Sequence, residues 1–336
     1  MHAYTLQPSA DGPMQLVLAE KPTPDPKAHE VVVQVKAVSL NYRDLAIASG
    51  RLGIPAGRIP VSDGAGEVVA IGSGVRHVSV GQRVAGLFFQ RWMTGPFHAS
   101  YHSHALGGSV DGMLAEQVVL EEAGVVPIDD KLTWEEAATL PCAGLTAWNA
   151  LVEFGRISAG QTVLVLGTGG VSIFALQFAK LHGARVIVTS SSDEKLNRAV
   201  QLGADATVNY RQHPDWEKEV WALTDGHGVD LVVEVGGAGT FERSLKSTRV
   251  AGKVALIGIL SGMQERMNLF EIIHRSLSVQ GIYVGSREMF VAMTAAMKQG
   301  GMKPVIGTTF NFADAPAAMA HMQAAGHFGK IVVRMA

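Results

Sequence analysis

The sequence has very little cysteine, and this scarcity excludes several classes of protein. Cys142 is the only cysteine among 336 residues, so an internal disulfide framework and a structural zinc lobe built from cysteines are both excluded. Neither sign of charge dominates, because 28 basic and 30 acidic side chains give a net charge of −2. Since no block of like charges forms a basic or acidic stripe, we expect no nucleic-acid partner and no membrane partner.

Long apolar runs are also missing from the chain. No segment approaches the ~20 apolar residues that a membrane helix requires, and residues 1–15 lack the pattern of a secretory leader. We therefore expect a cytoplasmic protein. Glycine, in contrast, is abundant, with 38 residues, and suits a fold with many tight turns. The length of the chain favours two domains.

The most informative glycines lie between an apolar run and a helix pattern. Residues 163–166 read Val-Leu-Val-Leu, and apolar residues recur at helical spacing from 171 to 181. A strand, a glycine turn and a helix in this order are typical of dinucleotide-binding folds, because a pyrophosphate approaches backbone N–H groups more closely than a Cβ would allow. A serine replaces the third glycine of the usual motif. We predict that a nicotinamide cofactor binds here, at Gly167, Gly169, Gly170, Val171 and Ser172.

The order of the expected elements divides the chain into two parts. Short strands at 30–38, 66–71 and 82–87, separated by Gly and Pro clusters, predict a β-rich first part. Between about 132 and 260, strands alternate with helices, which predicts a doubly wound parallel sheet and an α/β fold class. The remaining elements are expected at 278–284, 287–298, 313–325 and 331–334. We therefore predict a β-rich domain of residues 1–126 with 275–336, and a nucleotide-binding domain of residues 127–274.

Four motifs, together with this order of domains, resemble the medium-chain dehydrogenase/reductase superfamily, and most closely its zinc-independent quinone oxidoreductases and enoyl reductases. The motifs are Leu40-Asn41-Tyr42-Arg43-Asp44, the run from Leu140 to Trp148, Gly285-Ser286-Arg287 and Gly329-Lys330-Ile331-Val332-Val333. The resemblance implies a GroES-like catalytic domain, a Rossmann domain, and a homodimer paired through the late strands near 254–259 and 278–284. It also implies hydride transfer from NADPH to a quinone or an α,β-unsaturated ketone or aldehyde.

The resemblance further locates the positions at which zinc alcohol dehydrogenases of this superfamily bind their catalytic metal. They fall on Asn41, on Ser62 with Asp63, and on Cys142. Because catalytic zinc takes three ligands from Cys, His and carboxylate, an amide and a hydroxyl are poor substitutes, and we predict a metal-free site. Two alternatives remain: a zinc alcohol dehydrogenase with altered ligands, and a protein that binds NADPH without catalysis. A metal site at His98, His102 and His104 is disfavoured, because these residues are expected in an exposed, mobile loop.

The family motifs also assign roles to individual residues. They make Asn41 a donor to the nicotinamide or to a substrate carbonyl, and Tyr42 a proton donor or a wall of the pocket. Asp44 is expected to be structural, and Cys142 to be a small buried side chain. The cofactor-lining positions implied by the resemblance are Thr146, Ile257, Gly258, Ile259, Val284, Ser286 and Lys330.

The type of nicotinamide cofactor depends on the residues after the second strand of the nucleotide-binding part. NAD-selective sites place an acidic residue there for the ribose hydroxyls, whereas this chain has Ser190, Ser191 and Ser192. Hydroxyls with a nearby cation suit a 2′-phosphate. Lys195 and Tyr210 match positions that contact this phosphate in NADPH-dependent quinone oxidoreductases. An alternative role for Ser192 is that of a helix N-cap, and the negative charge of Asp193 is unfavourable to a bound phosphate. We nevertheless predict that the cofactor is NADPH.

Overall fold

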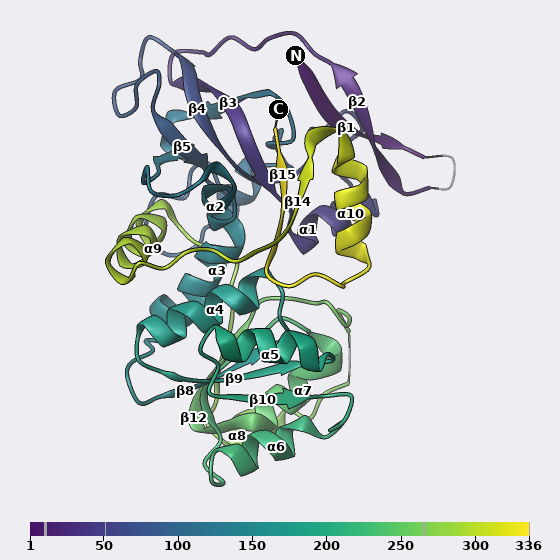
Figure 1. The fold of residues 1–336 in the computed structure, drawn as a ribbon, viewed down its shortest axis with the longest axis vertical. Coiled ribbons are helices and arrows are strands. Elements are labelled where there is room, and N and C mark those ends of the chain that lie inside the picture. The colour runs from purple at the N-terminus through teal and green to yellow at the C-terminus, as the bar shows by residue number, and fades with distance from the viewer. Residues whose placement is uncertain (10–11, 51, 265, 336) are drawn as a thin grey trace. The chain divides into compact units, whose positions relative to one another are not determined.

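A computed structural model describes residues 1–9, 12–50, 52–264 and 266–335 (Figure 1). The chain divides into two compact units, residues 1–143 with 286–336 and residues 144–285. Both boundaries lie later than predicted. The helix α2 (Trp134–Ala138) packs on strands of the first unit, so the first boundary moves beyond 126. The strand β13 (Ser278–Gly281) pairs within the sheet of the second unit, so the other boundary moves beyond 274.

The first unit contains a largely antiparallel sheet. Seven strands of the described residues form it, in the order β14-β15-β3-β4-β5-β7, with β6 paired to β3. They are β3 (Glu30–Ser39), β4 (Asp63–Ile71), β5 (Arg83–Gly86), β6 (Gln117–Glu121), β7 (Val125–Pro127), β14 (Ile306–Asn311) and β15 (Lys330–Arg334). A separate two-stranded ladder pairs β1 (His2–Pro8) with β2 (Met14–Glu20). Valines at 31, 33 and 35 of β3 are fully buried in the core of this unit, as the two-residue period of a strand requires.

The α-helices of the first unit range from five to fourteen residues among the described residues. The α-helices besides α2 are α1 (Tyr42–Ala48), α9 (Arg287–Gly300) and α10 (Ala315–Gln323). Short 3-10 turns are η1 (Ala99–His104), η2 (Glu122–Gly124) and η5 (Phe312–Asp314), and a π-turn, η3 (Leu140–Gly144), reaches the unit boundary. The helix α9 is followed by its C-cap Gly301, whose φ of 63° is the left-handed conformation that glycine adopts without strain.

The second unit is a parallel sheet with helical connections. Its strand order among the described residues is β10-β9-β8-β11-β12-β13, all parallel. The strands besides β13 are β8 (Thr162–Leu166), β9 (Arg185–Ser190), β10 (Ala206–Asn209), β11 (Val229–Glu234) and β12 (Thr248–Leu256). The helical segments are α3 (Leu145–Trp148), η4 (Asn149–Phe154), α4 (Gly170–Leu181), α5 (Asp193–Gln201), α6 (Trp216–Leu223), α7 (Ala238–Ser247) and α8 (Phe270–His274).

The strand order of the second unit reverses between β8 and β11. From β8 the chain proceeds outward to β9 and β10, and it then returns to β11 on the other side of β8. In open parallel sheets, ligands bind beyond the carboxyl ends of the strands at such a switch point. The predicted fold class, a β-rich unit with a doubly wound parallel sheet, is confirmed. No helix of the described residues has the length and apolar character needed to cross a bilayer.

Candidate functional site

Buried polar side chains gather in the first unit where β3 ends. The strand β15 pairs with β3, and the Leu40 N–H donates to the Ile331 carbonyl at 3.0 Å. This register places Lys330, the first residue of β15, beside Asn41, the residue that precedes α1. The side-chain contacts confirm the neighbourhood: the Lys330 Nζ donates to the Leu40 carbonyl at 2.5 Å and to Asn41 Oδ1 at 2.6 Å.

A buried carboxylate lies in the same cluster. Asp63 is fully buried at the start of β4, and its Oδ1 accepts from the Ser62 hydroxyl at 2.7 Å. Its Oδ2 accepts from the backbone N–H of Cys142 at 3.0 Å. Burial raises the pKa of Asp63, and the Lys330 ammonium is the strongest influence that opposes this rise. Each oxygen of the carboxylate therefore already has a hydrogen-bond donor.

Two further groups of the cluster have displaced pKa values. Burial raises the pKa of Asp44 to about 6, and its Oδ2 accepts from the Asn41 backbone N–H at 2.8 Å. This contact caps α1, so the structural role expected for Asp44 is confirmed. Burial raises the pKa of the Cys142 thiol, and Asp63 adds to the rise. The predicted small buried side chain of Cys142 is partly buried, with intermediate exposure.

The backbone that delivers Ser62 and Asp63 has an unusual conformation. Val61 has a φ of 69°, which is costly for a β-branched residue. The Met113 N–H donates to the Val61 carbonyl at 2.7 Å. Gly112 packs so closely that an added Cβ would lie 2.3 Å from the Val61 carbonyl oxygen. The segment around 107–113 thus holds Val61 in place, which the sequence did not indicate.

The neighbours of Asn41 along α1 point in different directions. Tyr42 is 47% exposed at the first turn of α1, so its phenol is accessible to solvent. Arg43 donates from Nη1 to the Leu106 carbonyl at 2.8 Å, and its guanidinium lies 4.5 Å from the centre of the Phe88 ring. These two contacts fix the arginine side chain.

The cluster offers a poor donor set for a catalytic metal ion. Asn41 Oδ1 and both Asp63 oxygens already accept hydrogen bonds. A lysine ammonium at the same place also repels a cation. Elsewhere in the described residues, no group of three or more His, Cys, Asp or Glu side chains is arranged to hold a metal ion.

The predicted phosphate-binding turn lies in the second unit between β8 and α4. Gly167 has a φ of 72°, and Gly169 is the N-cap of α4. A Cβ added at either glycine would meet no atom within 4 Å, so neither glycine is required for packing of the free protein. The open space beside both glycines at a helix N-terminus fits a pyrophosphate. Ser172 is buried and donates to the Leu166 carbonyl at 2.7 Å, which ties the helix to the strand.

The serines after β9 lie beside α5. The Ser192 side chain accepts from the Lys195 N–H, so it is the helix N-cap, as the alternative interpretation had it. This does not conflict with an anion site, because the N-terminus of α5 favours negative charge. Lys195 is partly buried in the first turn, and burial lowers its pKa. The Asp193 carboxylate accepts from Asn209 Nδ2 at 2.6 Å and Gln212 Nε2 at 2.9 Å.

The remaining residues assigned to the cofactor have diverse surroundings. Gly258 requires its glycine, because an added Cβ would lie 2.2 Å from the Val235 carbonyl oxygen. Val284 has a φ of 57°, and its carbonyl accepts from Asn149 Nδ2 at 2.8 Å. Ser286 is the N-cap of α9 and accepts from the Met289 N–H at 3.2 Å.

The exposure of the other assigned residues varies: Thr146 is buried on α3, whereas Ile259 and Tyr210 are 45% and 41% exposed. Ser190 is buried and its carbonyl accepts from the Tyr210 N–H.

The segment from Arg91 to Gly112 is ordered by an aromatic cluster. Trp92 is 3% exposed and packs on Phe89, Phe97 and Tyr101, with ring centroids 5.1 to 6.1 Å away. Its Nε1 donates to the Gly95 carbonyl at 2.9 Å. The segment includes the 3-10 turn η1, and His98 and His102 are exposed, as expected, whereas the expected mobility of this stretch stays a prediction.

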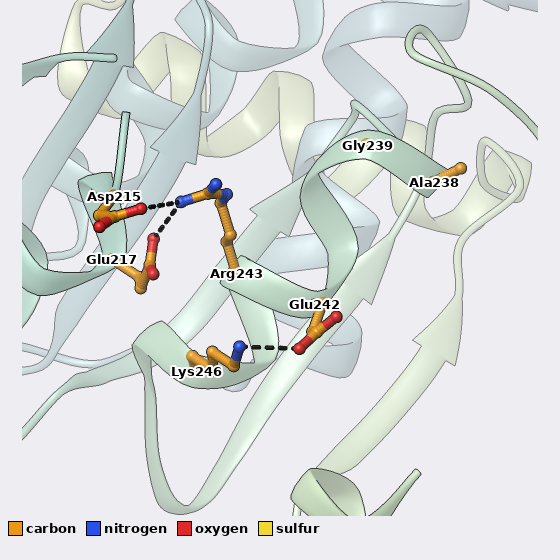
Figure 2. A pocket seen from close by; sticks show the side chains of 7 residues that line it. All are labelled: Asp215, Glu217, Ala238, Gly239, Glu242, Arg243 and Lys246. Carbon is orange, nitrogen blue, oxygen red and sulfur yellow. Dashed lines mark hydrogen bonds and ion pairs between the residues drawn. The ribbon is translucent and has the colours of Figure 1, made fainter. Parts of the chain in front are cut away.

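A surface pocket between α6 and α7 contains none of the predicted site residues (Figure 2). Arg243 bridges Asp215 at 3.2 Å and Glu217 at 2.8 Å, and Lys246 pairs with Glu242 at 2.7 Å. Because these opposite charges are already paired, the pocket offers little unbalanced charge to a ligand.

Comparison with known proteins identifies the family. Residues 27–130 match the alcohol dehydrogenase GroES-like domain, and residues 170–299 match the zinc-binding dehydrogenase domain. A zinc-type alcohol dehydrogenase-like protein of Schizosaccharomyces pombe is 41% identical over 91% of each chain. The chain belongs to the medium-chain dehydrogenase/reductase superfamily.

Further members of the superfamily differ in the activity that their names state. A quinone oxidoreductase of Pseudomonas aeruginosa is 32% identical over 96% of each chain. The crystal structure of an NAD-dependent alcohol dehydrogenase superposes with a TM-score of 0.91, at 35% identity, and covers all of both chains. The chain is therefore an oxidoreductase of this superfamily.

Proposed function

We propose that this protein reduces conjugated carbonyl compounds, quinones or α,β-unsaturated ketones and aldehydes, with NADPH and without a catalytic metal. The observation that carries the proposal is the polar cluster, in which the Lys330 ammonium bonds to Asn41 Oδ1 and both Asp63 oxygens accept hydrogen bonds, at two of the positions where zinc enzymes of the superfamily hold their metal. Without a Lewis acid, an isolated ketone would need its growing alkoxide stabilised by hydrogen bonds alone. A conjugated acceptor needs less help, because its negative charge spreads over an enolate or a quinone oxygen.

In this proposal the residues around α1 act on the carbonyl. When bound, NADPH supplies a hydride. The Asn41 amide donates a hydrogen bond to the carbonyl oxygen, which is worth about 3 kcal/mol for a well-aimed donor. The exposed phenol of Tyr42, the next residue, is the candidate to deliver the proton.

Selectivity for NADPH is supported by the chemistry beyond β9. The serine run contains no acid, and hydrogen bonds from the Asn209 and Gln212 amides hold the Asp193 carboxylate. Lys195 provides a cation in the first turn of that helix.

A substrate screen tests the proposal directly. Quinones, enones, enals and simple ketones are offered with NADPH and with NADH, with and without a chelator, and bound metal is measured on the same preparation. We expect turnover of conjugated acceptors with NADPH, unaffected by the chelator. Tight NADPH binding without turnover on the whole panel would instead support the non-catalytic alternative.

The second candidate function is that of a zinc alcohol dehydrogenase with altered ligands, and it is favoured by the name of the relative from Schizosaccharomyces pombe. It requires stoichiometric zinc in the purified protein and oxidation of a simple alcohol that ends when the zinc is removed. The metal measurement and the chelator arm of the screen separate the two candidates.

We also propose that the protein is a homodimer paired through β13. Of the two late strands predicted to pair, β12 lies inside the sheet and only β13 is at its edge in the described strand order. Phe270 and Ile273 of the nearby α8 are 60% and 77% exposed. Sedimentation equilibrium should give twice the chain mass. Replacing Ile273 by a charged residue, as in Ile273→Glu, should shift the measured mass toward that of the monomer.

A further inference from the structure

Lys330 is buried to an extent that is unusual for a lysine. Only 3% of its surface is exposed, whereas lysine side chains normally extend their ammonium group into water. Burial at this place costs free energy unless the N–H groups find acceptors. Two acceptors are present, the Leu40 carbonyl and Asn41 Oδ1.

The contact with Oδ1 decides the orientation of the Asn41 amide. A carboxamide has an acceptor end and a donor end, and the ammonium can bond only to the acceptor. Turning the amide over would place its N–H groups against a cation. The contact at 2.6 Å therefore fixes Oδ1 toward Lys330 and leaves Nδ2 as the other end.

Nδ2 of Asn41 is a buried donor without a hydrogen bond. The residue is 7% exposed, and Nδ2 has no hydrogen-bond partner among the described residues. The Asn41 side chain lies close enough to Asp63 to help lower the pKa of that carboxyl, but Nδ2 forms no hydrogen bond with it, and the two Asp63 oxygens accept from the Ser62 hydroxyl and the Cys142 N–H. A buried unsatisfied donor is rare and costly, and one explanation is an acceptor that arrives with a ligand.

We propose that Lys330 is a positioning residue, which holds the Asn41 amide so that Nδ2 remains available as a donor to the substrate carbonyl oxygen. This inference rests on the proposed function, because it gives Asn41 its partner. It assigns Lys330 to the orientation of the amide, in place of the cofactor contact that the resemblance implied.

A double-mutant cycle tests the inference. The variants are Lys330→Met, which keeps the length of the side chain and removes its donors, Asn41→Ala, and the pair together. We expect each single change to lower kcat for a conjugated carbonyl about 100-fold, as the loss of one oriented donor does, with little change in the Kd of NADPH. The double variant should be no slower than Asn41→Ala alone, since both changes remove the same interaction.

A matched control separates this effect from a general effect of losing a lysine. Lys36 lies on β3 of the same sheet and is only partly buried, and Lys36→Met should retain the kcat of the parent. Circular dichroism and urea titration confirm that each variant is folded. Multiplicative losses in the double variant, or a loss confined to NADPH affinity, would overturn the inference. So would a Lys330→Met variant that is less stable but has an unchanged kcat.

A measurement on the free protein keeps the inference distinct from the proposed function. The side-chain amide resonances of Asn41 in ¹⁵N-labelled protein are assigned by their loss in Asn41→Ala. A held amide should give two sharp proton signals, which shift and broaden in Lys330→Met but not in Lys36→Met. If no conjugated carbonyl is turned over while these signals respond, the proposed function fails and the positioning of Asn41 stands. Unchanged signals in Lys330→Met would refute the positioning itself.

Discussion

The two regions that carry the site residues are built in opposite ways. In the first unit, Lys330, Asp63 and Asn41 are buried, Lys330 is hydrogen-bonded to Asn41, and the Asp63 carboxylate is hydrogen-bonded to Ser62, so most of the arrangement is already formed in the free protein. In the second unit, Gly167 and Gly169 border open space, and the absence of side chains at these positions leaves room for a ligand. The first region should therefore respond to mutation through stability, and the second through ligand affinity.

The largest expected effect is on the stability of the buried cluster. Asp63→Ala removes the acceptor of the Ser62 hydroxyl and the Cys142 N–H, and it leaves the Lys330 ammonium with less compensating charge. We expect a loss of about 3–5 kcal/mol in the free energy of unfolding, measured by urea titration. Asp63→Asn, which keeps one carbonyl oxygen, should lose less. A loss below about 1 kcal/mol in Asp63→Ala would show that the cluster does not stabilise the fold.

The open turn should give the reverse result. Gly169→Val introduces a side chain where the free protein has space, so the thermal midpoint should change little, while NADPH and NADH should both bind about 100-fold more weakly, roughly 2.7 kcal/mol. Isothermal titration calorimetry measures both affinities. Gly66→Val is the matched change in the first unit, where an added Cβ would lie 2.2 Å from the Gln34 carbonyl oxygen. It should lower the midpoint strongly. Equal cofactor affinity in Gly169→Val and the parent would contradict the predicted turn.

The same contrast explains which parts of the molecule could be predicted from the sequence. The glycine turn was found because a short contiguous motif encodes it between a strand and a helix pattern. The strands β2 and β14 were missed, because none of their residues is fully buried and their apolar alternation is weak. The contact of Lys330 with Asn41 was also missed, since it joins residues 289 positions apart through the pairing of β15 with β3.

A third experiment sharpens the assignment of the cofactor. Lys195→Ala removes the cation in the first turn of α5, so we expect KM for NADPH to rise about tenfold, roughly 1.4 kcal/mol. The KM for NADH should hardly change, because NADH carries no 2′-phosphate. Steady-state kinetics with both cofactors make the comparison. An equal rise for both cofactors would rule out a contact with the phosphate.

The smallest expected effect concerns Asp44. The direction in which stability changes with pH tests whether ionising this buried carboxyl destabilises the fold. Its pKa of about 6 in the folded protein lies above the unfolded value of 3.8, so the folded state holds the proton more tightly. Stability is therefore lost as pH rises from about 4 through 6, because the buried carboxyl must ionise. Asp44→Asn keeps an oxygen for the Asn41 N–H and removes this cost. Its advantage over the parent in urea titrations should grow by about 1 kcal/mol between pH 5 and pH 8. An advantage that shrinks toward pH 8 would mean that the ionised carboxylate stabilises the cap of α1 by more than its burial costs.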